Sequence, residues 1–152
     1  MFDNIGVSLL CAIALIVSSC SFVLNVSTQI VCAKHRDETD PSIRTVVIAE
    51  GDARGKNIVI CDDLVRSGGT LVEAALAVKA AGANAVDVFV AHAAFETPSA
   101  HLRFCRGGRA EGVFRRFFVT SSNPVVTVHL PTDDVFTVLD LTPLVIQDLE
   151  NL

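Results

Sequence analysis

Residues 57–70, NIVICDDLVRSGGT, join an apolar run, two carboxylates, a short glycine-rich loop and the start of a helix. An uninterrupted apolar run such as Asn57–Cys61 is typical of a strand that is buried on both faces of a parallel sheet. The following stretch Thr70–Ala81, TLVEAALAVKAA, has apolar residues at helical spacing, and Gly82 follows it as a stop signal. This order of strand, loop and helix predicts an α/β fold.

The sequence on both sides of this unit repeats the alternation. We expect further strands or extended runs at residues 29–33, 45–49, 85–92, 117–120, 125–128 and 135–139, and helices at residues 97–105 and 143–152. The charged stretch Lys34–Arg44 contains Pro41 and therefore predicts a loop. Strands that alternate with helices indicate a parallel sheet flanked by helices, with right-handed crossovers.

The composition favours a folded protein that does not mainly bind nucleic acid. A chain of 152 residues suits one domain, and 51% hydrophobic against 19% charged residues excludes wholesale disorder. The net charge of -5 argues against a protein that neutralises nucleic-acid phosphates. The basic stretch Arg103–Arg116 is interpreted as a solvated loop, or as a contact for an anionic effector or another subunit. The five cysteines lack CxxC spacing, so neither a disulfide framework nor a zinc site is expected.

The N-terminal part of the chain leaves three alternatives open. Ile5–Val26 carries no charge and is long enough to cross a bilayer, which takes about 20 residues. The segment is a membrane anchor, a buried strand-and-helix unit, or unrelated sequence in place of a lost upstream domain. We predict an apolar segment at residues 1–25 and an α/β domain at residues 26–152. The expected location is cytoplasmic, with a membrane anchor and a cytoplasmic domain as the alternative.

The motif at residues 57–70 suits a phosphorylated sugar. Ligands of open α/β sheets bind beyond the carboxyl ends of strands, where Asp62 and Asp63 are expected. The loop that follows offers backbone N–H groups, two hydroxyls and a helix N-terminus, which favour an anion such as phosphate. Its residues are Arg66, Ser67, Gly68, Gly69 and Thr70. Carboxylates beside a phosphate need another partner, which sugar hydroxyls or a magnesium ion would supply. The alternative is an aspartate N-cap followed by a glycine turn.

The same stretch, CDDLVRSGGTL, resembles the ribose-phosphate motif of the phosphoribosyltransferase superfamily. Upstream, IVCAKHRDE resembles the catalytic flexible loop of ribose-phosphate pyrophosphokinases, or PRPP synthetases. Downstream, FVAHAAFETPSAHLRF, FFVTSSNP and VFTVLDLTPLVIQDL resemble later segments of that family, in the same order. The resemblance covers roughly residues 26–152 and only the family's C-terminal half. It implies a phosphoribosyltransferase-like parallel sheet flanked by helices.

The resemblance also implies roles for individual residues. Lys34 and Arg36 would be catalytic and would stabilise charge on the transferred diphosphoryl group. Asp62 and Asp63 would hold ribose hydroxyls, and residues 66–70 would bind the 5-phosphate. Magnesium would be bound together with ATP or PRPP, although the sequence identifies no metal ligands.

One histidine departs from the family's pattern. His92 matches the family's histidine after a strand, but Ala91 and Ala93 replace its usual neighbours. We therefore interpret His92 as a core or rim histidine.

The resemblance leaves three functions open. The first is PRPP synthesis for nucleotide biosynthesis, by transfer of diphosphate from ATP to ribose 5-phosphate. The second is a phosphoribosyltransferase that consumes PRPP, and the third is a non-catalytic subunit associated with PRPP synthetase. The family's ATP-contacting half and its pyrophosphate-clamping acidic segment are not recognised in the sequence, so we expect the isolated chain to be inactive. Homo- or hetero-oligomers are expected, with no nucleic-acid partner and with membrane contact only through residues 5–26.

Overall fold

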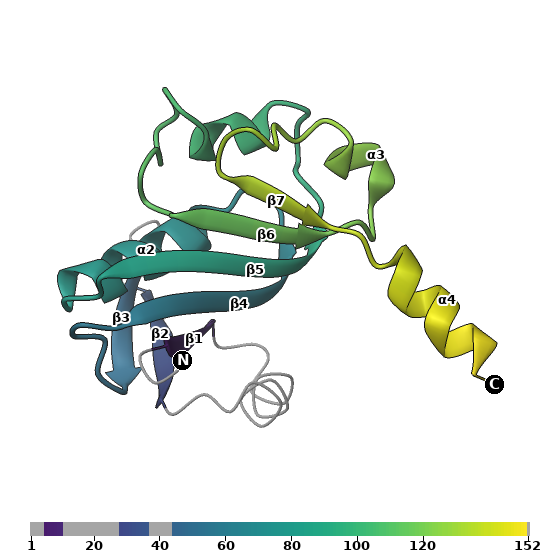
Figure 1. Ribbon diagram of the computed structural model, residues 1–152. Helices are drawn as coiled ribbons and strands as arrows, with labels where there is room; N and C mark the ends of the chain where they lie inside the picture. The colour runs from purple at the N-terminus through teal and green to yellow at the C-terminus, as the bar shows by residue number, and fades with distance from the viewer. Residues whose placement is uncertain (1–4, 11–27, 37–43, 152) are drawn as a thin grey trace.

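The computed structural model describes residues 5–10, 28–36 and 44–151 of the chain. These residues form an α/β structure (Figure 1). Its elements in chain order are β1 (Ile5–Leu10), β2 (Thr28–Arg36), β3 (Arg44–Glu50), β4 (Asn57–Val65), α2 (Gly69–Ala80), β5 (Ala85–Ala93), the 3₁₀ helix η1 (Ala100–Phe104), β6 (Arg116–Thr120), α3 (Pro124–Thr127), β7 (Phe136–Leu139) and α4 (Thr142–Glu150).

All these strands belong to one seven-stranded sheet with the order β3-β2-β1-β4-β5-β6-β7. Neighbouring strands from β2 to β7 pair in parallel, while β3 pairs with β2 in the antiparallel direction. The predicted parallel sheet is therefore confirmed, with β3 added as an antiparallel edge strand. Because the parallel strands end at the same edge, the loops that follow β4, β5 and β6 come together there.

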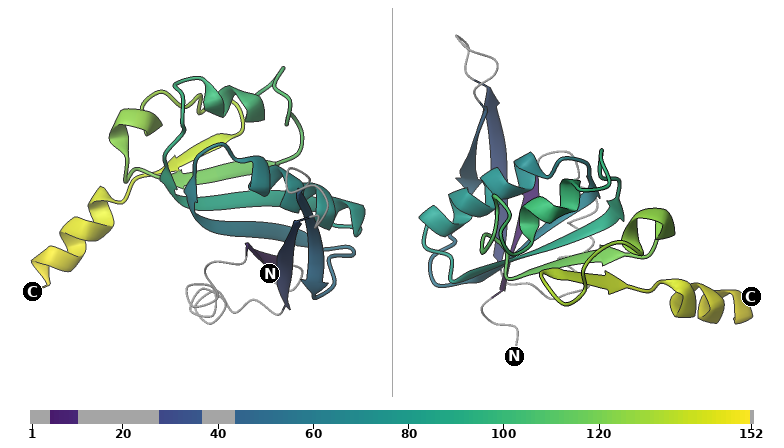
Figure 2. Two further views of the ribbon diagram at one scale, coloured as in Figure 1. Left: turned by 180° about the vertical axis from the view of Figure 1, so that it is seen from behind. Right: turned by 90° about the horizontal axis from the view of Figure 1, so that it is seen from above.

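Helix α2 packs against the sheet through its apolar side chains. Leu71, Ala74, Ala75 and Val78 are each at most 2% exposed, and α2 contacts β3, β4 and β5. Complete burial of a leucine or valine side chain contributes about 1.5–3 kcal/mol, so this face holds α2 in place. Figure 2 shows α2 and η1 on the same side of the sheet, whereas α4 projects away from it.

A second part of the core is aromatic and lies beside α2. The ring centroids of Phe104 and Phe117 are 5.1 Å apart, and those of Phe117 and Phe136 are 5.0 Å apart. Phe114 joins them with its centroid 5.8 Å from that of Phe104. Phe104, Phe114 and Phe117 are therefore packing residues, and their rings fix η1 onto β6 and β7.

Most predicted elements are confirmed, but three segments differ, the first of them because strand pairing overrides the local pattern. The predicted loop Lys34–Arg44 is wrong at both ends: residues 34–36 continue β2, and Arg44 begins β3, where it pairs with Arg36. Backbone pairing between β2 and β3 thus orders charged residues whose sequence shows no strand pattern. Residues 37–43, including Pro41, lie outside the described residues.

Residues 125–128 are not extended, and the predicted helix at residues 97–105 is shorter. Pro124 begins α3, and the N–H groups of Val126 and Thr127 donate to the carbonyl oxygen of Asn123 at 3.1 and 3.0 Å. Proline suits the first helical position because its fixed φ matches the helix. In the second segment only Ala100–Phe104 is helical, as a 3₁₀ helix.

The first strand lies within the apolar segment predicted at residues 1–25. Ile5–Leu10 pairs in parallel with β2 on one side and with β4 on the other. Residues 11–27 lie outside the described residues, so the boundary at residue 26 stays a prediction. None of the helices in the described part of the chain is both long and apolar enough to cross a membrane.

Candidate functional site

The end of β4 carries the two carboxylates of the motif. The sequence predicts that Asp62 and Asp63 follow the strand. They lie within it instead, because β4 pairs with β5 as far as Val65. Backbone pairing with a neighbouring strand here outweighs the low strand propensity of aspartate. Ile58 and Ile60 are fully buried, whereas Asp62 is half-buried and Asp63 exposed. The last part of β4 thus extends from the core to the edge where ligands are expected.

The glycine-rich loop turns the chain from β4 into α2. Gly68 is the N-cap of α2 with a φ of 70°, and its carbonyl oxygen accepts a hydrogen bond from Val72 N–H at 3.1 Å. The N–H group of Gly69 donates to Ser67 Oγ at 3.4 Å. Gly68, the N-cap residue, has no side chain to cap α2, and the first turn has no acidic residue. Such a helix N-terminus favours an anion.

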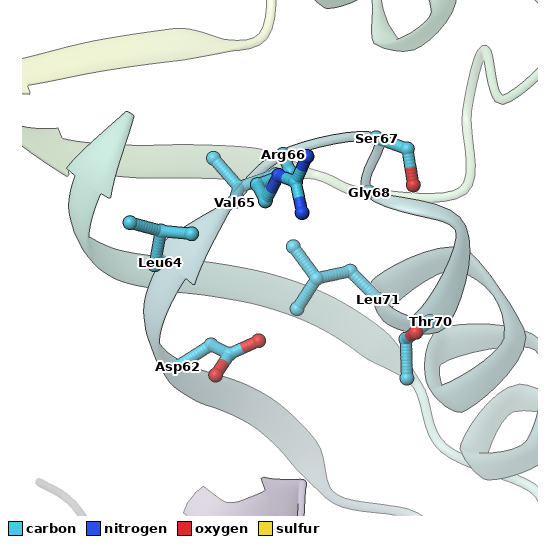
Figure 3. A pocket seen from close by; sticks show the side chains of 8 residues that line it. All are labelled: Asp62, Leu64, Val65, Arg66, Ser67, Gly68, Thr70 and Leu71. Atoms are coloured by element: carbon cyan, nitrogen blue, oxygen red, sulfur yellow. The ribbon is translucent and has the colours of Figure 1, made fainter. Parts of the chain in front are cut away.

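A pocket of about 180 Å³ lies between the end of β4 and this loop. Figure 3 shows Asp62 on β4, Thr70 at the start of α2, and the loop that joins the two elements. The pocket is lined by Asp62, Leu64, Val65, Arg66, Ser67, Gly68, Thr70 and Leu71. The structure therefore brings five of the predicted sugar-phosphate residues to one pocket, while Asp63 and Gly69 are not part of its lining. Val65 and Leu71 add an apolar wall that we did not predict, although both lie in the motif or directly after it.

Arg66 forms an ion pair across two loops. Its Nη2 lies 3.0 Å from Oε1 of Glu96, in the segment that follows β5. Both side chains are largely exposed, so the pair contributes at most about 1 kcal/mol. Arg66 therefore lines the pocket with a charge that Glu96 partly neutralises.

The two predicted catalytic residues lie on β2, at the same edge of the sheet. Leu9 of β1 pairs with Cys61 of β4, and Leu10 pairs with Cys32 of β2. Lys34 and Arg36 follow Cys32 on β2 and so extend toward the carboxyl edge, as Asp62 does on β4. The backbone register thus brings the ends of β2 and β4 to the same edge of the sheet, with β1 between the two strands.

His92 lies at the rim of the sheet, which is one of the two positions predicted for it. Its side chain is exposed at the end of β5, and its Nδ1 is 2.8 Å from Ser122 Oγ. The Ser122 hydroxyl also donates to the Ala91 carbonyl oxygen at 2.9 Å. These contacts tie β5 to the segment after β6.

Asp62 has an unusual electrostatic environment. Burial raises the pKa of the Asp62 carboxyl to about 6, against an ordinary value of 3.8. The N–H group of Asp63 donates to Asp62 Oδ1 at 3.0 Å and opposes part of this effect, while the Asp63 charge adds to it. The ionised Asp62 carboxylate therefore lowers the stability of the fold. Such unfavourable charges are typical of groups that bind a ligand.

We expect Asp62 to lower the stability of the chain as pH rises from 3.8 to about 6. Because its pKa is higher in the folded chain, the folded state binds the proton more tightly, and stability is lost as the carboxyl ionises. The pKa values of Asp52 and Asp140 are lowered by hydrogen bonds, which gives the opposite sign. The measurement is therefore the difference in urea unfolding free energy between Asp62→Asn and the unchanged chain. The stability of Asp62→Asn relative to the unchanged chain should increase as pH rises through this window. A constant difference would contradict the raised pKa of Asp62.

Gly68 allows the aromatic core to approach the loop. A Cβ atom on Gly68 would overlap Cζ of Phe104, whereas one on Gly112 would meet no heavy atom within 4 Å. Both glycines have a φ of 70°, so the two positions share the same backbone strain on substitution. We expect Gly68→Ala to lower the free energy of unfolding by about 1–3 kcal/mol more than Gly112→Ala, because only the first is overpacked. Equal losses in urea unfolding would show that Phe104 simply moves aside.

Known proteins share sequence and fold with this chain. Residues 6–106 match the family model of the phosphoribosyl transferase domain. The chain is 36% identical over 114 residues to ribose-phosphate pyrophosphokinase 3, mitochondrial, of Spinacia oleracea, covering 74% of this chain and 27% of that protein. It is 38% identical over 115 residues to ribose-phosphate pyrophosphokinase 4 of Oryza sativa subsp. japonica, covering 74% of this chain and 34% of that protein. The chain thus spans about a third or less of these relatives' length.

A solved structure shares the fold. The phosphoribosylpyrophosphate synthetase from Mycobacterium smegmatis superposes with a TM-score of 0.71 at 24% identity, covering 97% of this chain and 44% of that chain. The likeness predicted from the motifs is confirmed, and so is the phosphoribosyltransferase-like fold. Because the family model matches more than half of its residues, the chain belongs to the phosphoribosyl transferase domain family.

Proposed function

We propose that this chain provides the ribose 5-phosphate site of a PRPP synthetase-like enzyme. In that reaction, diphosphate is transferred from ATP to the 1-hydroxyl of ribose 5-phosphate, which yields PRPP and AMP. The observation that carries the proposal is the pocket that Asp62, Arg66, Ser67, Gly68 and Thr70 line together. The relatives that are named ribose-phosphate pyrophosphokinases support it.

In this proposal the loop binds the 5-phosphate. The helix N-terminus at Gly68 and the guanidinium of Arg66 supply positive charge, and the hydroxyls of Ser67 and Thr70 supply donors. Asp62 accepts hydrogen bonds from ribose hydroxyls at the other side of the pocket, with Asp63 beside it. A charged acceptor makes these bonds stronger than bonds between neutral groups.

Lys34 and Arg36 are proposed to act on the diphosphoryl group. Transfer of this group gains most from cations that are aimed at its non-bridging oxygens in the transition state. Their position on β2, at the carboxyl edge of the sheet, supports this role. The two cations would contribute little to the affinity for ribose 5-phosphate itself, because their contacts form as the group is transferred.

Magnesium fits the carboxylates of this site. Protein sites often hold Mg²⁺ through one or two carboxylates together with waters and substrate phosphates, and Asp62 and Asp63 can supply those carboxylates. When bound, the ion would neutralise charge on the phosphate oxygens. No group of three or more candidate metal ligands occurs among the described residues, so substrate oxygens would have to complete the coordination.

Partners and location follow the same proposal. Ribose 5-phosphate, ATP and PRPP are the proposed small-molecule partners, and the chain is proposed to work as a homo- or hetero-oligomer with PRPP synthetase subunits. A cytoplasmic location also stays a proposal, since the name of the Spinacia oleracea relative places that protein in mitochondria.

Calorimetric titration of the chain tests the proposal directly. We expect saturable binding of ribose 5-phosphate, weaker binding of inorganic phosphate and none of ribose, because the loop recognises the phosphate. Absence of ribose 5-phosphate binding would overturn the proposal. Release of pyrophosphate from PRPP in the presence of a nucleobase would favour the phosphoribosyltransferase alternative.

A further inference from the structure

The segment after β5 lies against the loop that forms the pocket. We call residues 94–104 the supporting segment. At its start, the N–H group of Ala94 donates to the Val65 carbonyl oxygen at 2.9 Å. At its end, Nη1 of Arg103 donates to the Ser67 carbonyl oxygen at 2.5 Å. Two residues at the ends of this segment thus bind the backbone just before Gly68.

The supporting segment is itself fixed by the aromatic core. Phe104 is only 2% exposed, and its ring centroid lies 5.1 Å from that of Phe117 and 6.2 Å from that of Phe136. The same ring lies against Gly68, where a Cβ atom would overlap its Cζ. Arg103, the neighbour of Phe104, is therefore held close to the loop by a buried anchor.

The guanidinium of Arg103 has an uncommon environment. Its Cζ lies 5.6 Å from the centroid of the Phe104 ring, and its Nε is buried with no hydrogen-bond partner among the described residues. The ion pairs found among those residues are Arg54–Asp52, Arg66–Glu96 and Arg115–Asp87, and none of them includes Arg103. In the described part of the chain, a positive charge without a carboxylate partner therefore lies directly behind the loop, where it favours an anion in the pocket.

The bond from Arg103 to Ser67 also orients a peptide group. In a planar trans peptide, the carbonyl oxygen and the next N–H group point in opposite directions. Since Arg103 holds the Ser67 carbonyl oxygen on the side of η1, the N–H group of Gly68 is turned the opposite way. Ser67 and Gly68 both line the pocket.

We infer that Arg103 is a positioning residue for phosphate binding. It holds the Ser67–Gly68 peptide in the orientation that presents an N–H group to the phosphate, and its charge strengthens the attraction from behind the loop. The inference rests on the proposed ribose 5-phosphate site. It also revises the interpretation of Arg103, which the basic stretch Arg103–Arg116 had suggested to be a solvated or subunit-contact residue.

The test compares three substitutions of Arg103 with one matched control. Arg103→Ala removes the side chain, Arg103→Met keeps an aliphatic stem over Phe104 without charge or donors, and Arg103→Lys keeps the charge. The control is Arg109→Ala, which removes an exposed arginine of the same basic stretch. Each purified chain is titrated by calorimetry with inorganic phosphate and with ribose 5-phosphate, and its urea midpoint is measured.

Both uncharged variants should weaken binding by about tenfold or more, by the same factor for the two ligands, because the effect acts through the phosphate alone. Arg103→Lys should recover part of this loss, and Arg109→Ala should bind like the unchanged chain. A merely structural role would shift the urea midpoint of Arg103→Met but leave its affinities unchanged, which would overturn the inference. If the unchanged chain binds neither ligand, the proposed function fails together with the inference. If the unchanged chain binds both ligands and all three variants match it, only the inference fails.

Discussion

Replacing Asp62 and Asp63 together by asparagine will abolish measurable binding of ribose 5-phosphate while the chain stays folded. Hydrogen bonds from sugar hydroxyls to a carboxylate contribute about 1.5–3 kcal/mol each, so losing two such acceptors lowers affinity by about two to four orders of magnitude. Asparagine has almost the same shape as aspartate, and the raised pKa of Asp62 shows that the neutral form suits its surroundings in the fold.

The matched control is Asp133→Asn with Asp134→Asn, an adjacent pair of aspartates in the same chain that are both exposed. It changes the net charge by the same amount, and the amide oxygen introduced at the second position can still accept the hydrogen bond that Asp134 Oδ2 receives from Arg106 N–H. Calorimetry should therefore show loss of binding in the first double variant only. Unchanged affinity after substitution of Asp62 and Asp63 would remove these carboxylates from the sugar site.

The purified chain will form no PRPP from ATP and ribose 5-phosphate, although it binds the acceptor. Phosphoryl transfer depends on holding donor and acceptor in line, and such positioning supplies about 7–11 kcal/mol of the barrier reduction. The chain offers a proposed acceptor pocket and two proposed cations, but we recognise no residues for the nucleotide. A coupled assay for PRPP at saturating ATP and magnesium should therefore stay at the level of a sample without protein.

Robust PRPP formation by the chain would contradict this expectation. In that case, Lys34→Ala and Arg36→Ala test whether the two cations act on the transferred diphosphoryl group. Each should lower kcat by about 10²–10³-fold with little change in the affinity for ribose 5-phosphate, because a cation at the transferred group acts in the transition state. Loss of affinity without loss of turnover would place these residues in sugar binding instead.

Much of the fold follows from patterns that are local in the sequence. The strand at Asn57–Cys61 and the helix after Gly69 are evident because an apolar run and a helical repeat each span a whole element. The loop between them is equally evident, because glycine and hydroxyl residues in that order suit a turn that binds an anion. These local signals also named five of the residues that line the pocket.

Other features depended on contacts between distant segments. β4 continues through Asp62 and Asp63 because β5 pairs with it, and Lys34 to Arg36 remain in β2 because β3 pairs with them. The charged residues in these two segments show no strand periodicity in the sequence, so neither pairing could be predicted from them. Local propensity is weak compared with the backbone hydrogen bonds that a neighbouring strand provides, so these boundaries were set by the sheet.

The sequence by itself determined the α/β class, the motif that is proposed to bind phosphate, and the family, because each is carried by residue types at short fixed spacing. The tertiary structure alone decided that Arg103 and Phe104 lie behind the loop, more than thirty positions after Gly68 in the chain. In the sequence, Arg103 is one basic residue among several, and nothing local distinguishes it from Arg109. Only the packing of Phe104 into the aromatic core brings its neighbour to the Ser67 carbonyl, because the orientation of a side chain depends on what its element is packed against.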